Sequence, residues 1–256
     1  MSVVVAITNQ KGGVGKTTTS VNLSSALAEK GKSILLIDMD PQANAASGLG
    51  LEPEPGSSLY PVMVGEKAIE QQITATSVEG LSLIPAEVDL AGCEVEIARE
   101  ANPLAKLRTI IEPIKSQGRF DYILLDCPPS VGILMTSSLA AADGLLIPVQ
   151  CEFYALEGIT KILDLVNRLK QQGVNPDLYI VGVLMTMYDA RTRLSQQVVQ
   201  ELQEHLPDKV FKTIIPRSIR LSEAPSFGQS ILSYDPQGIG ATSYRQLSEE
   251  FLQRLQ

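Results

Sequence analysis

The sequence predicts an α/β protein with a single, mostly parallel, twisted central sheet covered by helices on both faces. Two observations lead to this fold class. Short, continuously apolar segments of the kind that forms buried parallel strands recur at 3–8, 33–38, 121–126 and 144–149. Segments with helical periodicity alternate with them, as in chains that wind helices over both faces of one sheet.

The other segments follow the same alternation. In the helix expected at 195–205, Leu194, Val198 and Leu202 should share one buried face. No repeat, low-complexity tract or linker interrupts the chain, so residues 1–256 are predicted to form one domain. The remaining expected elements are a helix at 16–29, a mobile loop followed by a short helix within 39–73, strands at 81–85, 178–185 and 210–215, and helices at 104–115, 156–170 and 240–255.

Composition excludes several classes of protein. The chain has 256 residues, of which 44% are hydrophobic, and no apolar run reaches the roughly 18 to 20 residues of a membrane-spanning helix. The amino terminus has neither the basic region nor the cleavage site of a secretory signal, so we expect a cytoplasmic protein. Cys93, Cys127 and Cys151 are then expected to be reduced thiols, the alternative being an iron–sulfur cluster shared across a dimer.

Charge is unevenly distributed along the chain. The net charge of -8 argues by itself against nucleic acid and acidic membranes as partners. Residues 189–220, however, include six basic and four acidic residues, so this stretch has a net charge of +2 and the rest of the chain -10. Its arginines, which are candidates for phosphate contacts, are Arg191, Arg193, Arg217 and Arg220.

A glycine-rich phosphate-binding motif lies between the first predicted strand and the first predicted helix. It reads KGGVGKTT, and its backbone N–H groups are expected to curl around phosphate oxygens at the start of the helix. Lys16 would neutralise the β- and γ-phosphates, and the Thr17 hydroxyl would bind Mg²⁺. The expected nucleotide-binding residues are Lys11, Gly12, Gly13, Val14, Gly15, Lys16, Thr17 and Thr18.

Carboxylates end two of the predicted strands beside this motif. Asp38 and Asp40 follow the strand at 33–38, and Asp126 ends the strand at 121–126. Ligands bind at the carboxyl ends of strands in open α/β sheets, so these acids should face the phosphates. Asp126 has the position of the acid that holds a water on Mg²⁺, and Asp38 is expected near the same metal.

These motifs resemble the ParA/MinD group of ATPases with a second lysine in the phosphate loop. The resemblance extends almost from end to end, and the segments IPVQCEFYALEG and TIIPRSIRLSEAPSFGQ favour the chromosomal ParA or Soj branch. It implies slow hydrolysis of ATP with Mg²⁺ in a homodimer that sandwiches the nucleotide. Lys11 would reach the partner's nucleotide, and Asp40 would position the attacking water, making Lys11, Lys16 and Asp40 the catalytic set.

The same resemblance implies further partners. The adenine would lie near Pro216 and Ser218, although the family more often has Asn where Ser218 stands. Arg191 and Arg220 match positions that the Soj branch uses for non-specific DNA binding, and a ParB-like protein would activate hydrolysis. ATP-bound dimers would then associate with the nucleoid.

Other functions remain open at this stage. A MinD-like membrane ATPase would need a cationic amphipathic tail, whereas Leu247, Phe251 and Leu255 are expected to face the core, so no stable membrane association is expected. No amino-terminal helix-turn-helix domain is recognisable. An electron-transfer ATPase of the nitrogenase-reductase type would need two cysteines at a dimer axis. The cargo could be a chromosome, a plasmid or a protein organelle.

Overall fold

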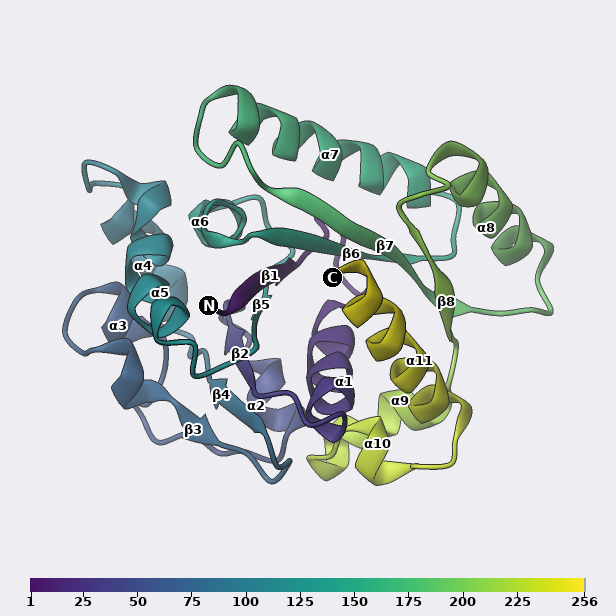
Figure 1. Cartoon of the computed structure of the whole chain (residues 1–256), viewed down its shortest axis with the longest axis horizontal. Helices are drawn as coiled ribbons and strands as arrows, with labels where there is room; N and C mark the ends of the chain where they lie inside the picture. Colours follow the sequence, from purple (N-terminus) through teal and green to yellow (C-terminus); the bar gives the residue numbers. More distant parts are fainter. Residues whose placement is uncertain (256) are drawn as a thin grey trace.

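A computed structural model describes residues 1–255, and within them one sheet of eight strands lies between two layers of helices (Figure 1). The strand order is β3-β4-β2-β5-β1-β6-β7-β8, with every neighbouring pair parallel except β3 and β4. The predicted fold class is therefore confirmed. The strands are β1 (Val3–Ile7), β2 (Ile34–Asp38), β3 (Thr74–Ala75), β4 (Leu81–Ile84), β5 (Tyr122–Asp126), β6 (Gly144–Gln150), β7 (Tyr179–Tyr188) and β8 (Val210–Pro216).

The helices divide between the two faces of the sheet. One face packs against α1 (Lys16–Glu29), α2 (Asn44–Gly48), α9 (Ile219–Glu223), α10 (Ile231–Tyr234) and α11 (Ile239–Arg254), with the 3-10 turn η3 (Ala224–Phe227). The other face packs against α3 (Tyr60–Met63), α4 (Leu90–Ile97), α5 (Lys106–Gln117), α6 (Ile133–Ala141), α7 (Ala155–Gln171) and α8 (Arg193–His205), together with the 3-10 turn η1 (Ile69–Gln72). A third 3-10 turn, η2 (Pro103–Ala105), directly precedes α5.

Strand β1 shows why the central strands are apolar throughout. Val4 and Ala6 belong to the core under one face, whereas Val5 and Ile7 belong to the core under the other, and all four are fully buried. Successive side chains of a strand point to opposite faces, so a sheet covered on both sides requires an unbroken apolar run. The parallel pairing of β5 with β2 and β1 places the carboxyl ends of these three strands next to one another.

Several local predictions need correction. The segment 39–73 contains α2, α3 and η1 rather than one loop and one short helix. Helices α4 and α6 were not predicted. Helix α6 is buried on nearly all sides and has no polar stripe that a periodic pattern could reveal. Leu194 is 43% exposed, so it does not share the buried face of α8, which presents Ser195, Val198 and Leu202 to the core.

The carboxyl-terminal helix α11 packs as the sequence predicts. Leu247 and Phe251 are fully buried, and Leu255 is partly buried against the same core. Among residues 1–255, no helix combines the length and apolarity that crossing a bilayer would require.

Candidate nucleotide-binding site

The phosphate loop joins the end of β1 to the start of α1. Gly13 and Gly15 have φ angles of 73° and 85°, in the left-handed region that favours glycine. A Cβ atom added to Gly12 or Gly13 would meet nothing within 4 Å, so the loop borders open space. No side chain caps the start of α1, and the N–H groups of its first turn are available to an anion. This backbone fits a phosphate group.

Neighbouring strands hold the phosphate loop in place. Asn9 donates its side-chain N–H to the Pro148 carbonyl of β6 at 2.8 Å, and the Thr186 hydroxyl of β7 donates to the Val14 carbonyl at 2.8 Å. The Lys16 Nζ donates to the Lys11 carbonyl at 3.1 Å across the mouth of the loop. The contacts of Asn9 and Thr186 come from distant parts of the sequence, and together with the Lys16 bond they hold the loop in place.

Lys16 is the buried cation of the site. It is 7% exposed, and burial lowers the pKa of its ammonium group, an effect that the nearby Asp126 carboxylate opposes. A buried ammonium held only by a carbonyl oxygen gains by pairing with phosphate oxygens. The predicted role of Lys16 at the phosphates stays a prediction.

Asp38 and Asp126 are side by side in the register of β2 and β5, and both are fully buried. Burial raises the pKa of Asp38 well above its usual range, and the adjacent Asp126 carboxylate raises it further. Both Asp38 oxygens are occupied, since Oδ1 accepts the Asp40 N–H at 3.0 Å and Oδ2 the Ala45 N–H at 3.1 Å. Asp38 therefore shapes the following loop, and its predicted role at the metal stays a prediction.

Asp126 has one free oxygen. Its Oδ1 accepts the Ser20 hydroxyl at 2.8 Å, while Oδ2 is buried and has no hydrogen-bond partner within the described chain. Burial raises the pKa of Asp126 to about 6, although the nearby Thr17 hydroxyl, the Ser20 hydrogen bond and the Lys16 ammonium group lower it. A buried, unsatisfied carboxylate oxygen beside a threonine hydroxyl fits a Mg²⁺ ion with its bound water. Of the predicted metal-binding residues, Thr17 and Asp126 are thus the two with an oxygen available to bind Mg²⁺.

The catalytic loop, which we define as residues 38–50, leaves Asp40 at its surface. Asp40 is only partly buried, and its Oδ1 accepts the Gln42 N–H, so the carboxylate keeps capacity to orient a water. Lys11 is exposed on the other side of the phosphate loop, where it forms an ion pair with Glu152. Next to that pair, Phe153 and Tyr154 are 77% and 60% exposed. Exposed aromatic side chains beside a cation suit a protein interface.

A cavity of about 240 Å³ adjoins the phosphate loop. Its lining includes Pro216 and Ser218, as predicted for the adenine, together with Gly15 and Thr18 of the loop. Met187 also lines it, with a left-handed φ of 52°. Met187 was not predicted as a site residue; it lies two residues beyond the predicted strand at 178–185, within the observed β7. The remaining lining residues are Thr186, Ile215, Arg217, Leu221, Ser222, Pro225 and Tyr244.

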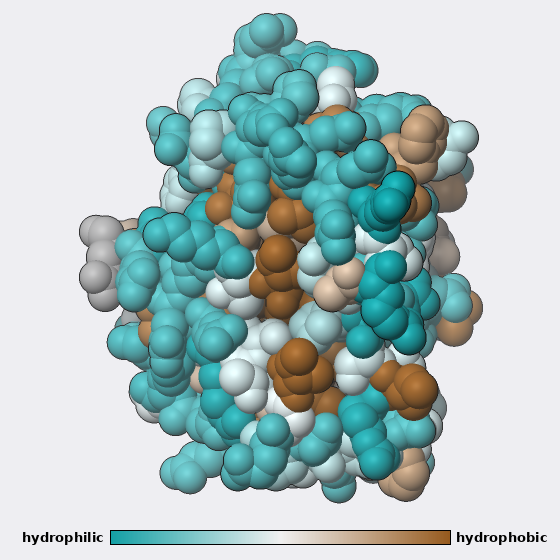
Figure 2. All heavy atoms as spheres, turned by 90° about the vertical axis from the view of Figure 1, so that its right-hand side faces the viewer, coloured by the Kyte–Doolittle hydropathy of each residue, from teal (hydrophilic) through white to brown (hydrophobic). Residues whose placement is uncertain are grey.

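The four predicted arginines gather beyond the carboxyl ends of β7 and β8, and we call this group the arginine edge. Arg191, Arg193, Arg217 and Arg220 are all exposed. The Arg217 N–H bonds to the Tyr188 carbonyl, which ties the two strand ends together. The side of the molecule that carries α8 and β8 faces the viewer in Figure 2, where hydrophilic side chains surround a smaller hydrophobic group.

Carboxylates hold two of these arginines. Arg191 donates from Nε and a terminal nitrogen to the two oxygens of Asp189, at 2.9 and 2.8 Å. These bonds hold the pKa of Asp189 down at about 2. Arg220 donates to Glu223 at 3.1 Å and lies 5.9 Å above the Tyr234 ring. Phosphate binding at Arg191 or Arg220 therefore has to compete with an existing carboxylate.

Comparison with known proteins places the chain in a family. A family model described as an AAA domain matches residues 2–180. The sporulation initiation inhibitor protein Soj of Bacillus subtilis is 50% identical over 251 residues, which cover 98% of each chain. The chromosome partitioning protein ParA of Caulobacter vibrioides is 45% identical over 252 residues, covering 98% of this chain and 94% of the relative. The chain belongs to the ParA/Soj family of ATPases.

Solved structures support the same fold for this ParA/Soj family member. A protein from Mycobacterium smegmatis, described as cobyrinic acid a,c-diamide synthase with bound ADP and magnesium, superposes with a TM-score of 0.86 at 34% identity. That comparison covers 100% of this chain and 96% of the other. The cell division ATPase MinD of Pyrococcus furiosus superposes with a TM-score of 0.83 at 26% identity over both full chains. The fold is thus shared by proteins with different functions, and ADP and magnesium occupy one of them.

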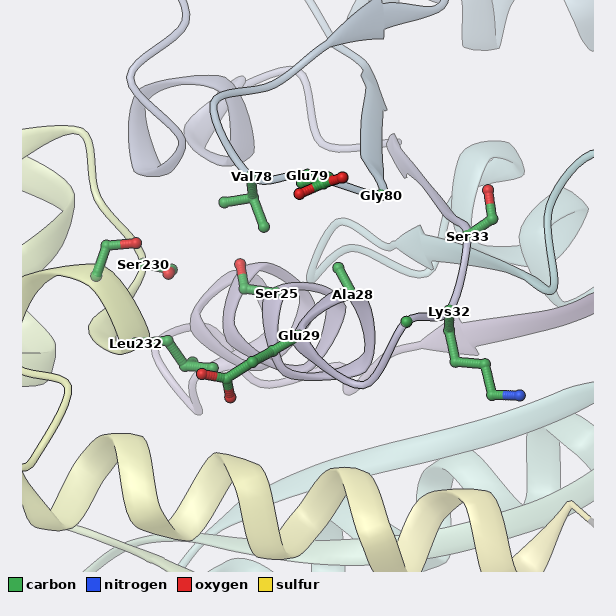
Figure 3. A pocket seen from close by; sticks show the side chains of 12 residues that line it. Ser25, Ala28, Glu29, Lys32, Ser33, Val78, Glu79, Gly80, Ser230 and Leu232 are labelled. Atoms are coloured by element: carbon green, nitrogen blue, oxygen red, sulfur yellow. The ribbon is translucent and has the colours of Figure 1, made fainter.

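A second cavity lies away from the phosphate loop. It has a volume of about 590 Å³ and lies between the end of α1, the β3–β4 turn and α10 (Figure 3). Ser25 and Glu29 line it from α1, Val78 and Glu79 from the turn, and Leu232 from α10. This cavity lies beside the amino ends of β2 and β4, whereas the phosphate-binding loop and the paired acids lie at the carboxyl ends of the strands.

The three cysteines are buried in the core. Burial raises the pKa of the Cys93, Cys127 and Cys151 thiols to about 12 each. Within residues 1–255, no group of three or more histidines, cysteines or acids is arranged to hold a metal ion. The alternative of a shared iron–sulfur cluster gains no support from these buried, protonated thiols.

Proposed function

We propose that this protein is a ParA-type ATPase that forms an ATP-bound homodimer, binds DNA without sequence preference and positions an intracellular cargo. The cargo would be a chromosome, a plasmid or another assembly, with a ParB-like protein as the activating partner. The observation that carries the proposal is the position of the arginine edge. Four exposed arginines lie at the same end of the sheet as the nucleotide cavity, and Arg217 lines that cavity.

The nucleotide chemistry rests on the buried half of the site. Lys16 and the N–H groups of α1 would bind the phosphates, with Gly12 and Gly13 leaving room for them. Thr17 and Asp126 would hold Mg²⁺, which supplies charge neutralisation in the transition state. Asp40 would orient the attacking water. Hydrolysis by one chain should be slow, because the second cation of the loop, Lys11, is paired with Glu152 at the surface instead of stabilising the transferred charge.

Dimer formation would follow from Lys11. Its exposed ammonium group lies at the surface of the phosphate loop, where Glu152 is its partner. A second nucleotide facing this surface would offer stronger anionic partners than one carboxylate. The exposed Phe153 and Tyr154 would be covered in the same interface. The dimer should therefore depend on the γ-phosphate and dissociate with ADP.

DNA binding would be non-specific because guanidinium groups can contact phosphate oxygens without reading the bases. A dimer doubles the number of arginines available on one surface. Each neutralised phosphate should add about 0.9 to the slope of log affinity against log salt concentration. The protein would then be cytoplasmic, associated with the nucleoid when bound to ATP and not stably associated with membranes.

The experiment is a mobility shift on random-sequence duplex DNA with ATP or ADP. We expect ATP-dependent binding that weakens steeply with salt and is lost in Arg191→Glu and Arg220→Glu. Arg168→Glu, at an exposed position near the carboxyl end of α7, is the matched control with the same change in charge. If both charge reversals at the arginine edge bound DNA as tightly as the unaltered protein, the proposed DNA contact would be wrong. Binding to anionic vesicles instead would favour a MinD-like function.

A further inference from the structure

Two glycines far apart in the sequence bring their backbones into direct contact. A Cβ atom added to Gly228 would lie 2.6 Å from the Gly50 Cα, and one added to Gly50 would lie 2.8 Å from the Gly228 carbonyl oxygen. Real Cβ atoms do not approach so closely. Both residues also have left-handed φ angles, 69° at Gly50 and 64° at Gly228. Only glycine satisfies both conditions at both positions.

Gly50 is the last residue of the catalytic loop. Hydrogen bonds at the two ends of α2 link it to Asp38 at the end of β2. Asp38 accepts the Ala45 N–H at the start of α2, and the Ser47 carbonyl at the end of α2 accepts the Gly50 N–H at 3.1 Å. A shift of the loop around Asp40 is therefore passed to Gly50 through less than two turns of helix.

Gly228 is the last of residues 216–228, which we call the basic segment. This segment lines part of the nucleotide cavity and contains Arg217 and Arg220, two of the four arginines of the arginine edge. Pro216, Ser218 and Leu221 line the cavity near the start of this segment, and Arg220 lies between them on α9. The Gly228 N–H closes the segment by bonding to the Pro225 carbonyl at 3.0 Å. The basic segment thus touches the nucleotide cavity at one end and the catalytic loop at the other.

We propose that the contact between Gly50 and Gly228 couples the catalytic loop to the basic segment, so that the bound nucleotide sets the position of Arg220. This coupling rests on the proposed function, since it regulates the DNA contact. Two backbones already in van der Waals contact have no side chain that could change rotamer to absorb a displacement. A movement of the loop on binding a γ-phosphate must therefore displace η3 and α9 or break the contact. Coupling of this kind is reciprocal, so DNA bound at Arg220 should also strengthen ATP binding.

The variants Gly228→Ala and Gly50→Ala test the coupling from its two sides. The measured quantity is the ratio of duplex affinities with a non-hydrolysable ATP analogue and with ADP. We expect this ratio to fall about tenfold or more in both variants, within the usual range of coupling between sites. Gly173→Ala is the matched control, because Gly173 has a φ of 70° but a Cβ there would meet nothing within 4 Å. If all three variants kept the ratio of the unaltered protein to within about twofold, the contact would not couple the catalytic loop to the basic segment, and the proposal would be wrong.

Hydrogen exchange on the unaltered protein provides a test that needs no variant. We expect amides at 40–50 and 224–228 to gain protection together when the ATP analogue replaces ADP. Protection that changes at 40–50 alone would overturn the coupling, whether or not DNA binds. Joint protection without any ATP-dependent DNA binding would preserve the coupling and reject the proposed function, so the two failures are distinguishable.

Discussion

At the phosphate loop, Lys16 is buried and hydrogen-bonded to the backbone, whereas at the arginine edge Arg191 and Arg220 are exposed and paired with carboxylates. Both groups are cations that would bind phosphate, but water solvates the exposed arginines and is largely excluded from Lys16. A buried cation is specific and strongly bound to its ligand, because removing the ligand leaves the charge poorly solvated. An exposed arginine exchanges partners at little cost, which suits contact with any DNA sequence.

The largest expected effect concerns how well the folded protein excludes solvent from the buried half of the nucleotide site. With a pKa of about 12 instead of 9, the Cys127 thiol beside Asp126 should form about a thousandfold less thiolate at pH 8. We expect Cys127, Cys93 and Cys151 to resist iodoacetamide in the native protein and to react fully in guanidinium. Mass spectrometry of both samples measures this. Labelling of native Cys127 at the rate of a free cysteine would show that the site opens to solvent.

Removing the buried cation should have the next largest effect. We expect Lys16→Ala to weaken Mg·ATP binding about a hundredfold or more, because a charge-assisted hydrogen bond contributes up to about 3 kcal/mol. Isothermal calorimetry measures the affinity. Lys30→Ala, at the other end of α1, is the control, since its ammonium group is paired with Glu249 on the surface. Equal affinities of the two variants would contradict the role of Lys16.

Lys11 lies between the two extremes, exposed but part of the phosphate loop. We expect Lys11→Ala to keep its ATP affinity yet weaken the dimer about tenfold or more, as for a close charge pair across an interface. Light scattering with ATP measures this in an Asp40→Ala background, which should bind ATP without hydrolysing it. Lys161→Ala on α7 is a control with the same loss of charge. A monomeric Asp40→Ala protein with ATP would reject the sandwich dimer.

The smallest effect is expected at the arginine edge. Asp189→Asn releases Arg191 from its carboxylate and should tighten duplex binding about two- to fivefold, because an exposed ion pair contributes about 0 to 1 kcal/mol. The Asp189 pKa of about 2 means that this carboxylate is ionised at every pH used for DNA binding, so the effect should not vary between about pH 6 and 8. Asp208→Asn removes one charge before β8, at a carboxylate that forms no ion pair within residues 1–255, and it serves as the control. The same gain in both variants would indicate a general charge effect.

Local patterns in the sequence were sufficient to predict the fold class, and they singled out residues that the structure brings together beside the phosphate loop. Apolar strands, the glycine-rich motif and the acids at strand ends are all visible in short segments, and parallel strands necessarily bring their carboxyl ends to one edge. Lys16, Thr17 and Asp126 could therefore be assigned to the site from these patterns alone. Only one short helix was predicted within 39–73, and the number and bounds of those present were missed, since helices of four or five residues are stabilised by their tertiary contacts rather than by a periodic pattern.

Free hydrogen-bonding capacity, by contrast, depends on how the folded chain packs. In the sequence, Asp38 and Asp126 both end an apolar strand and are both predicted near Mg²⁺. Among residues 1–255, however, backbone N–H groups bond to both oxygens of Asp38, whereas one oxygen of Asp126 has no hydrogen-bond partner. Likewise, the glycines at 50 and 228 have no visible relationship in a linear chain. Their contact depends on how two loops meet after α1, α2 and η3 pack on one face of the sheet, and the close packing of that face fixes the distance between them.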